Sequence, residues 1–167
     1  MIFNSGNVSS NEITFESNEI KIFDNGNIIK TNNGTAKSIK DNFFINAKKF
    51  EYNKKKSTLV AFDGIVKYPN KKIEIQANKF EYFEKKSLIK AYGDVILRDF
   101  LNNFTINSSE IFYSAKKGIL TSPKESILSD DVGNVFLSSD FTFKRNEKLI
   151  KITNATLTDN QKNTYKI

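Results

Sequence analysis

The sequence predicts an all-β fold made of about five stacked repeats, each close to 30 residues long. Three observations lead to this prediction: a block that recurs at a fixed offset, an apolar and polar alternation with a period of two, and turn-forming residues between the alternating segments. No segment shows an apolar stripe with helical spacing. The repeats fill all 167 residues, so we expect a single domain over 1–167.

The clearest repeat joins residues 45–52 and 75–82, which share most of their residues at an offset of 30. A lysine-rich turn follows each of these blocks, and an apolar segment follows each turn. Weaker copies of the block begin at Phe15, Ile106 and Phe136. The pattern of each unit therefore predicts two or three short antiparallel strands joined by tight turns. This arrangement is typical of sandwiches, jelly rolls, barrels and β-solenoids.

The alternation inside a repeat changes phase once. Ile73, Ile75 and Ala77 alternate with polar residues, and after a slip of one position Phe80 and Tyr82 continue the pattern. Such a slip predicts a bulge or a corner within the strand. We expect turns or positive φ at Gly26, Gly34, Gly64, Gly93 and Gly118.

A small residue recurs once in every unit, and we expect these residues to lie in register on one face of the sheet. They are Ser17, Ala47, Ala77, Ser108 and Ser138. One interpretation is packing, in which small side chains interdigitate with the large ones that follow. The other is that they line a groove.

Composition excludes several kinds of chemistry. The chain has no Cys and no His, which rules out Cys/His zinc sites, Ser-His triads and haem ligation. Asp94 with Asp99, or Asp130 with Asp131, could be offered as glycosidase carboxylate pairs, but aspartate is ordinary at turns. We therefore expect no enzymatic activity, no catalytic residue, no metal and no cofactor.

The net charge of +7 comes almost entirely from lysine, since the only arginines are Arg98 and Arg145. Lysine could simply solvate exposed strand faces, or it could attract an anionic partner. Nucleic acid is not the expected partner, because the aromatic side chains alternate inward while the lysines point outward. No apolar run approaches the ~18 residues of a membrane-spanning helix. Polar residues 4–6 follow the first three, so we expect any export signal to lie outside this sequence.

The segment 91–97, Ala-Tyr-Gly-Asp-Val-Ile-Leu, together with the preceding Ile-x-Ala-x-x-Phe-x-Tyr block at 75–82, resembles the OstA-like family of lipopolysaccharide-transport proteins. This family includes the bridge protein LptA, the inner-membrane partner LptC and the amino-terminal domain of the assembly protein LptD. The segment 154–160 looks most like the LptD type. The resemblance implies a β-jellyroll with an open groove, a periplasmic location and a piece of a longer exported protein attached to an outer-membrane barrel.

The resemblance also implies a function: binding the acyl chains of lipid A in the groove and passing lipopolysaccharide across the periplasm. The predicted groove residues are Ile45, Ala47, Phe50, Tyr52, Ile75, Ala77, Phe80, Tyr82, Ile106, Ile111 and Tyr113. The lysines expected to contact lipid A phosphates are Lys55, Lys56, Lys72, Lys85 and Lys86.

Two further expectations concern partners. Other OstA-like proteins are expected to pair with an edge strand, which the sequence pattern places at residues 13–22, while residues 136–152 lead into a downstream region. The alternative function is a structural, self-associating β-solenoid without a lipid ligand, because lining residues and core residues have the same composition.

Overall fold

The computed structural model describes residues 2–9 and 13–167, and among these it contains fifteen β-strands and no α-helix. The predicted all-β fold is therefore confirmed. The strands are β1 (Ile2–Ser9), β2 (Ile13–Phe23), β3 (Ile28–Ser38), β4 (Phe43–Asn53), β5 (Thr58–Tyr68), β6 (Ile73–Phe83), β7 (Leu88–Asp99), β8 (Phe104–Ser114), β9 (Ile119–Ser122), β10 (Ser126–Asp130), β11 (Val135–Ser138), β12 (Asp140–Lys144), β13 (Leu149–Thr153), β14 (Thr156–Thr158) and β15 (Thr164–Lys166). Short 3₁₀ turns are η1 (Asp24–Gly26), η2 (Pro69–Lys71), η3 (Glu84–Lys86) and η4 (Arg145–Glu147).

Strands β1 to β8 pair in sequence order, and every pair is antiparallel. This order corrects one expectation: β2, which covers residues 13–22, is paired on both sides and is not an edge strand. The amino-terminal edge is β1 instead. The sheet is open, because β1 at one end does not pair with the last strands at the other.

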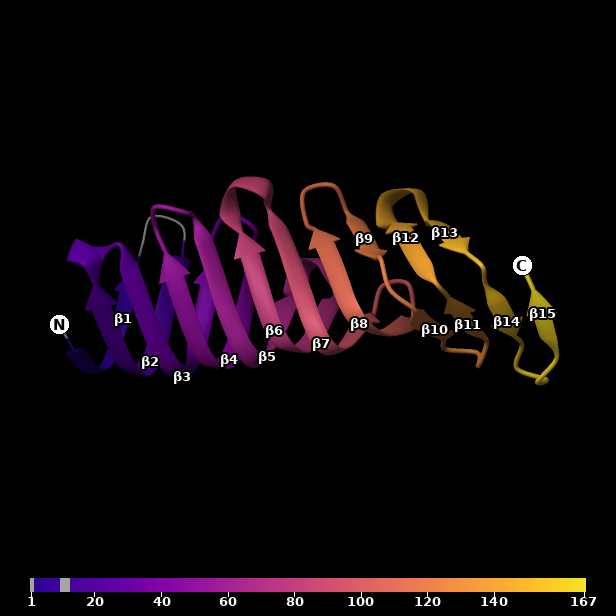
Figure 1. The fold of residues 1–167 in the computed structure, drawn as a ribbon, viewed down its shortest axis with the longest axis horizontal. Helices are drawn as coiled ribbons and strands as arrows, with labels where there is room; N and C mark the ends of the chain where they lie inside the picture. Colours follow the sequence, from indigo (N-terminus) through magenta and orange to yellow (C-terminus); the bar gives the residue numbers. More distant parts are fainter. Residues whose placement is uncertain (1, 10–12) are drawn as a thin grey trace.

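The sheet divides at β8. Residues 104–108 of β8 pair with β10, whereas residues 112–114 pair with β9. One branch continues as β9, β12 and β13, and the other as β10, β11, β14 and β15 (Figure 1). Pro123 lies between β9 and β10, at the point where the continuous strands of the earlier repeats are replaced by separate short ones.

A row of small residues crosses the sheet at the middle of the strands. Ser17 pairs with Gly34, Gly34 with Ala47, Ala47 with Gly64, and Gly64 with Ala77. The row continues through Ser108, Ser126 and Ser138. The predicted alignment of the small residues is thus confirmed, and we call this row the fold line.

The strands bend at the fold line. Asn33, Asp63 and Asp94, which lie beside it, have φ of 48°, 51° and 46°, a left-handed conformation that Asn and Asp tolerate better than most residues. The side-chain phase reverses there, so Ile75 and Phe80, on the two sides of the bend in β6, are both completely buried. The predicted phase slip is confirmed, and a register shift accompanies it between β6 and β7.

Each bent strand contributes one half to each of two arms. Towards the carboxy-terminal end, Figure 1 shows β9, β12 and β13 of the first arm above β10, β11, β14 and β15 of the second. The first arm contains the strand ends joined by turns 24–27, 54–57, 84–87, 115–118 and 145–148, together with β9, β12 and β13. The second arm contains the strand ends joined by turns 39–42, 69–72, 100–103 and 131–134, together with β10, β11, β14 and β15.

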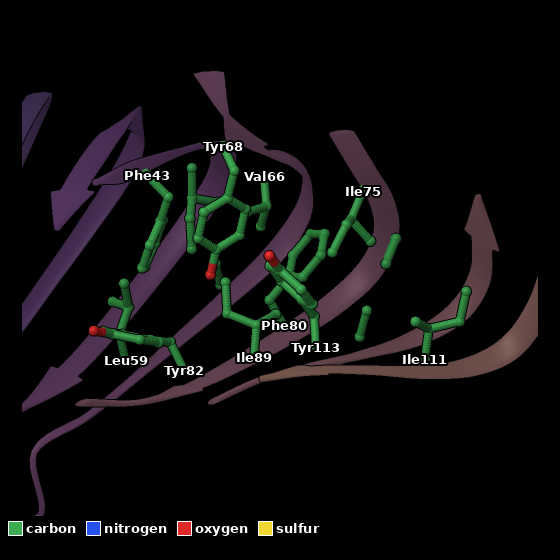
Figure 2. Close-up of a cluster of buried hydrophobic side chains, with 14 of the residues drawn as sticks. Phe43, Leu59, Val66, Tyr68, Ile75, Phe80, Tyr82, Ile89, Ile111 and Tyr113 are labelled. Atoms are coloured by element: carbon green, nitrogen blue, oxygen red, sulfur yellow. The ribbon is translucent and has the colours of Figure 1, made fainter. Parts of the chain in front are cut away.

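The core lies between the arms and is aromatic near its centre (Figure 2). Phe43 of the second arm packs edge-on against Tyr82 of the first, with ring centroids 4.7 Å apart. Tyr68 of the second arm packs the same way against Tyr113 of the first, at 5.1 Å. Such edge-to-face contacts add to the burial of apolar area, so they hold the arms together.

The glycine expectations are partly wrong. Gly26, Gly93 and Gly118 have positive φ, as expected. Gly34 and Gly64, however, lie within β3 and β5 on the fold line rather than at turns. A Cβ at Gly64 would lie 2.7 Å from the Ala47 Cβ and closer still to the Asn46 carbonyl oxygen. Glycine is needed at this position because neighbouring strands approach too closely for any side chain.

The variant Gly64→Ala should therefore destabilise the protein by about 1–3 kcal/mol, as overpacking does. The free energy of unfolding, measured by urea titration, checks this expectation. Adding Ala47→Gly to the same chain should restore part of the loss, because it removes one of the clashing carbons. An unchanged urea midpoint for Gly64→Ala alone would show that the strands do not meet as closely as described.

Candidate functional site in the interior between the arms

The predicted groove residues line the space between the arms. Ten of the eleven are buried with 0–4% exposure, and Ala47 is half-buried on the fold line. They pack against one another and against the rest of the core, so their side chains already fill the interior around β4 to β8. Their inward orientation follows from this burial, while a role in binding lipid stays a prediction.

The two rows of turns meet along one side of the molecule, opposite the fold line. The Tyr82 hydroxyl and the Ser87 hydroxyl of the first arm donate to the Asp41 carboxylate of the second, at 2.7 and 2.9 Å. Further along, the Lys71 ammonium donates to the Ala115 carbonyl oxygen at 2.8 Å. These contacts form a polar seam that closes the interior.

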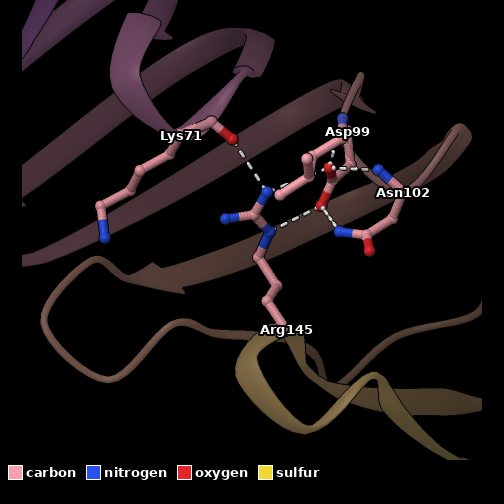
Figure 3. Close-up of polar contacts among 5 residues, drawn as sticks. Lys71, Asp99, Asn102 and Arg145 are labelled. Atoms are coloured by element: carbon pink, nitrogen blue, oxygen red, sulfur yellow. Dashed lines mark hydrogen bonds and ion pairs between the residues drawn. The ribbon is translucent and has the colours of Figure 1, made fainter.

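A buried ion pair ends this seam. The Arg145 guanidinium donates to both carboxylate oxygens of Asp99, from Nε at 2.6 Å and from Nη2 at 3.0 Å, and also to the Lys71 carbonyl oxygen (Figure 3). Asn102 donates to the same carboxylate through its backbone and side-chain nitrogens. The side chains of Arg145 and Asp99 are only 7% and 0% exposed. We call Arg145, Asp99 and Asn102 the seam latch.

The electrostatics of the latch favour the charged pair. Burial alone raises the pKa of Asp99, but the hydrogen bonds from Arg145 and Asn102 outweigh burial, and the pKa lies below its ordinary value. Burial likewise lowers the pKa of Arg145, yet the hydrogen bond and charge of Asp99 raise it overall. Both groups therefore stay ionised in the folded protein.

Tyrosine hydroxyls form a layer beneath the seam. Burial raises the pKa of Tyr113 to about 12, and it also raises the pKa of Tyr82 and that of Tyr68 well above the ordinary tyrosine value, so all three hydroxyls keep their protons. The Tyr82 hydroxyl is satisfied by Asp41. The buried Tyr68 hydroxyl has no hydrogen-bond partner among the described residues, which leaves a polar group available in the interior.

An apolar cavity opens beside the latch, where the arms separate. Its volume is about 380 Å³. The second arm and β8 contribute apolar side chains from one side, and β13 of the first arm contributes them from the other. The lining residues are Asn102, Phe104, Leu128, Ser129, Asp130, Phe136, Ile150 and Ile152. Asn102 belongs both to the latch and to this cavity, so the latch stands at the cavity rim.

Sequence reasoning did not identify this cavity. Phe136, Ile150 and Ile152 were recognisable as repeat positions, but nothing local distinguishes them from the filled interior of earlier repeats. The available signal was Pro123, which interrupts the pattern between β9 and β10 and precedes the division of the sheet.

The predicted phosphate-contacting lysines, Lys55, Lys56, Lys72, Lys85 and Lys86, are exposed on turns beside the seam. They do not line the cavity. The Lys55 ammonium lies 2.8 Å from the Asp24 carboxylate. Their position beside the seam agrees with the idea of a flanking row, while contact with phosphates stays a prediction.

Three of the four carboxylates offered for glycoside hydrolysis have structural partners. Asp99 belongs to the latch, Asp94 accepts a hydrogen bond from Asn78, and Asp130 accepts hydrogen bonds within its own turn. Within residues 2–9 and 13–167, no cluster of three acidic residues could hold a metal ion. None of the helices described there is long and apolar enough to cross a membrane.

No family model and no curated protein sequence match this chain. Among solved structures, the fold is similar to that of LptH from Pseudomonas aeruginosa, the LptA-homologous periplasmic component of the conserved lipopolysaccharide transport device. The TM-score is 0.59 at 11% identity, over 66% of this chain and 80% of the LptH chain. At this identity the likeness establishes the fold, which is an open antiparallel β-jellyroll of the LptA type.

Removing the cation from the latch should be costly. Arg145→Met leaves the Asp99 carboxylate buried without its counter-charge, and we expect a loss of about 3–5 kcal/mol in unfolding free energy. Urea titration measures this loss. Adding Asp99→Asn should recover much of it, because the amide is neutral and its oxygen still accepts the turn N–H groups. A single variant as stable as the parent would contradict a buried, charged latch.

The latch should also make stability depend on acid. Because folding lowers the pKa of Asp99, its contribution is fully present above the ordinary aspartate value of about 3.9 and is lost as the pH falls through the folded-state value. Asp99→Asn should flatten this part of the pH profile of unfolding free energy. Asp24→Asn, at an exposed carboxylate paired with Lys55, serves as control and should change the profile little. Identical effects of the two variants would contradict the assignment.

Proposed function

We propose that this chain binds acyl chains of lipopolysaccharide in the space between its two arms and passes the lipid along a series of β-jellyroll proteins. The observation that carries the proposal is the apolar cavity at the divided end of a fold shared with LptH. The strands that line this cavity belong to the same sheet as β4 to β8, which carry the inward-facing aromatic and aliphatic residues. We propose on the same grounds that the chain belongs to the OstA-like family and acts in the periplasm.

The cavity has the size and composition that such a ligand needs. Its volume falls within the roughly 300–1,000 Å³ usual for small-molecule sites, and five of its eight lining residues are apolar. Burial of each CH₂ group is worth about 0.8 kcal/mol, so a chain of a dozen carbons would gain about 8–10 kcal/mol before the costs of ordering. Asn102, Ser129 and Asp130 stand at the rim, where a polar headgroup would remain hydrated.

The filled interior suggests how the ligand advances. The predicted groove residues of β4 to β8 are already packed, so an acyl chain would first occupy the cavity and then displace side chains of the core. The unpaired Tyr68 hydroxyl would meet a polar group or water once the core opened. In this proposal, a groove along β4 to β8 forms only when the ligand displaces the core side chains there.

Partners would join at the sheet edges. Among the described residues, β1 pairs only with β2, β13 only with β12, and β15 only with β14. Each of these three strands presents backbone groups that could accept a strand of another OstA-like protein.

A second candidate function is favoured by the packed interior of β4 to β8. A structural, self-associating β-solenoid would use the same edges and the same core and would bind no lipid. Only the lipid-binding function requires the cavity, so a substitution in the cavity distinguishes the two functions.

Ile150→Glu should discriminate between them. Ile150 lines the cavity but is 43% exposed, so a glutamate there should leave the fold intact while placing a charge where an acyl chain would lie. Binding of a fluorescent fatty acid and of purified lipid A, measured by fluorescence titration, should weaken by about tenfold or more.

The matched control is Leu149→Glu, at the neighbouring residue of β13, which is 39% exposed and does not line the cavity. This variant should bind both ligands as the parent does. Absence of binding by the parent, or equal loss in both variants, would reject the lipid-binding proposal in favour of the structural one.

A further inference from the structure

The lysines of this chain fall into two groups that differ in their partners. On the outer faces of both arms, most lysines are paired with acidic residues across or along the strands. Such pairs include Lys21 with Glu19, Lys37 with Glu16, Lys67 with Glu74, and Lys79 with Glu81. The outer sheet faces are therefore close to electrically balanced.

The lysines of the turns are different. Within the described part of the chain, ten exposed lysines of turns and loops form no ion pair; they are Lys54, Lys56, Lys72, Lys85, Lys86, Lys116, Lys117, Lys124, Lys148 and Lys162. Seven of them stand on turns 54–57, 84–87 and 115–118 of the first arm or next to η2 in the second, beside the seam. The excess positive charge of the molecule is thus concentrated along its turn side.

The acidic residues near the seam do not balance this charge. Asp41 is engaged by Tyr82 and Ser87, and Asp99 is neutralised in the latch by Arg145. These carboxylates are turned inward to hold the arms together, whereas the lysine ammonium groups extend into solvent. Closing the seam therefore leaves its outer surface basic.

Large apolar side chains are exposed on the same side. Ile39 is 71% exposed on turn 39–42, and Phe100 and Leu101 are 56% and 62% exposed on turn 100–103. The seam contacts place these second-arm turns beside the basic first-arm turns, since Ser87 reaches Asp41 and Arg145 reaches Asp99. Exposed apolar side chains next to unpaired lysines are the combination found on surfaces that lie at a membrane interface.

We propose that the turn side of this protein docks onto a lipid bilayer that carries anionic phospholipid headgroups. The turn lysines contact the headgroup phosphates, and Phe100 with Leu101 inserts at the boundary with the acyl region. The charge of the turn side favours this occupant over a neutral surface, and its apolar tips favour a bilayer over a soluble anion. This surface is distinct from the interior cavity and does not depend on lipopolysaccharide binding.

Docking in this orientation brings the interior cavity close to the membrane. Phe100, Leu101 and the cavity-lining Asn102 belong to one turn, so insertion of this turn brings the rim of the cavity to the bilayer surface. A lipid could then leave or join the membrane without crossing bulk water.

Vesicle co-flotation tests the proposal, with vesicles of phosphatidylcholine alone or mixed with phosphatidylglycerol. We expect binding to the mixed vesicles that declines with salt, and little binding to phosphatidylcholine alone. Replacing Lys54, Lys116, Lys117 and Lys148, none of them a predicted lipid A phosphate contact, by Gln should weaken binding about tenfold or more. The control replaces Lys21, Lys30, Lys37 and Lys49 by Gln, which removes the same charge from the outer sheet faces and should have a much smaller effect.

Insertion is read from a second measurement. The chain has no cysteine, so Leu101→Cys provides a single site for an environment-sensitive fluorophore, and Asn107→Cys on the outer face of β8 provides its control. Mixed vesicles should shift the emission of the label at 101 to shorter wavelength and leave the label at 107 unchanged. No shift at 101, or equal losses of flotation in the two charge variants, would overturn the proposal. The fatty-acid titration of the variant that carries the four turn substitutions should match the parent, which separates this result from failure of the interior site.

Discussion

The close approach of neighbouring strands at the fold line is the constraint from which the rest of this structure follows. Gly34 and Gly64 have no room for a Cβ, and Ser17, Ala47 and Ala77 oppose them with the smallest side chains available. Because strands β2 to β8 bend there, each of them contributes buried side chains to the same interior from both of its halves. A single continuous sheet thus encloses a core that ordinarily requires two separate sheets.

Much of this could be predicted from the sequence because it depends on local pattern. The repeat, the alternation and the phase slip between Ala77 and Phe80 are properties of successive residues, and they determine which side chains face inward. The repeat also aligned the small residues. Gly34 and Gly64 were assigned to turns because glycine more often serves there, and only the pairing of strands reveals a close contact.

Other features could not be predicted, because they depend on residues far apart in the sequence. Asp99 drew attention as a carboxylate, but its partner Arg145 comes from another repeat and nothing near either residue indicates the pair. The cavity has the same kind of lining as the filled interior. Whether Ile150 and Ile152 are covered depends on what the opposite arm places against them, and beyond β8 that arm lies farther away. Similarly, the composition shows an excess of lysine, but it does not show where the excess lies. Only the structure shows that positive and negative charges nearly balance on the sheet faces, whereas positive charge dominates on the turn side.

The spacing of the seam contacts has a consequence for how the chain folds. Asp41 and Ser87 are 46 residues apart, Lys71 and Ala115 are 44 apart, and Asp99 and Arg145 are 46 apart. Each contact therefore spans about one and a half repeats, whereas the hairpins themselves are local. In a simple linear array, each unit interacts only with its immediate neighbours and can fray independently. Here every seam contact bridges an intervening unit, which raises the contact order and couples the units over longer stretches of chain. A growing chain can form its hairpins as they are made, but it can close around its core only after the following repeat has also been added.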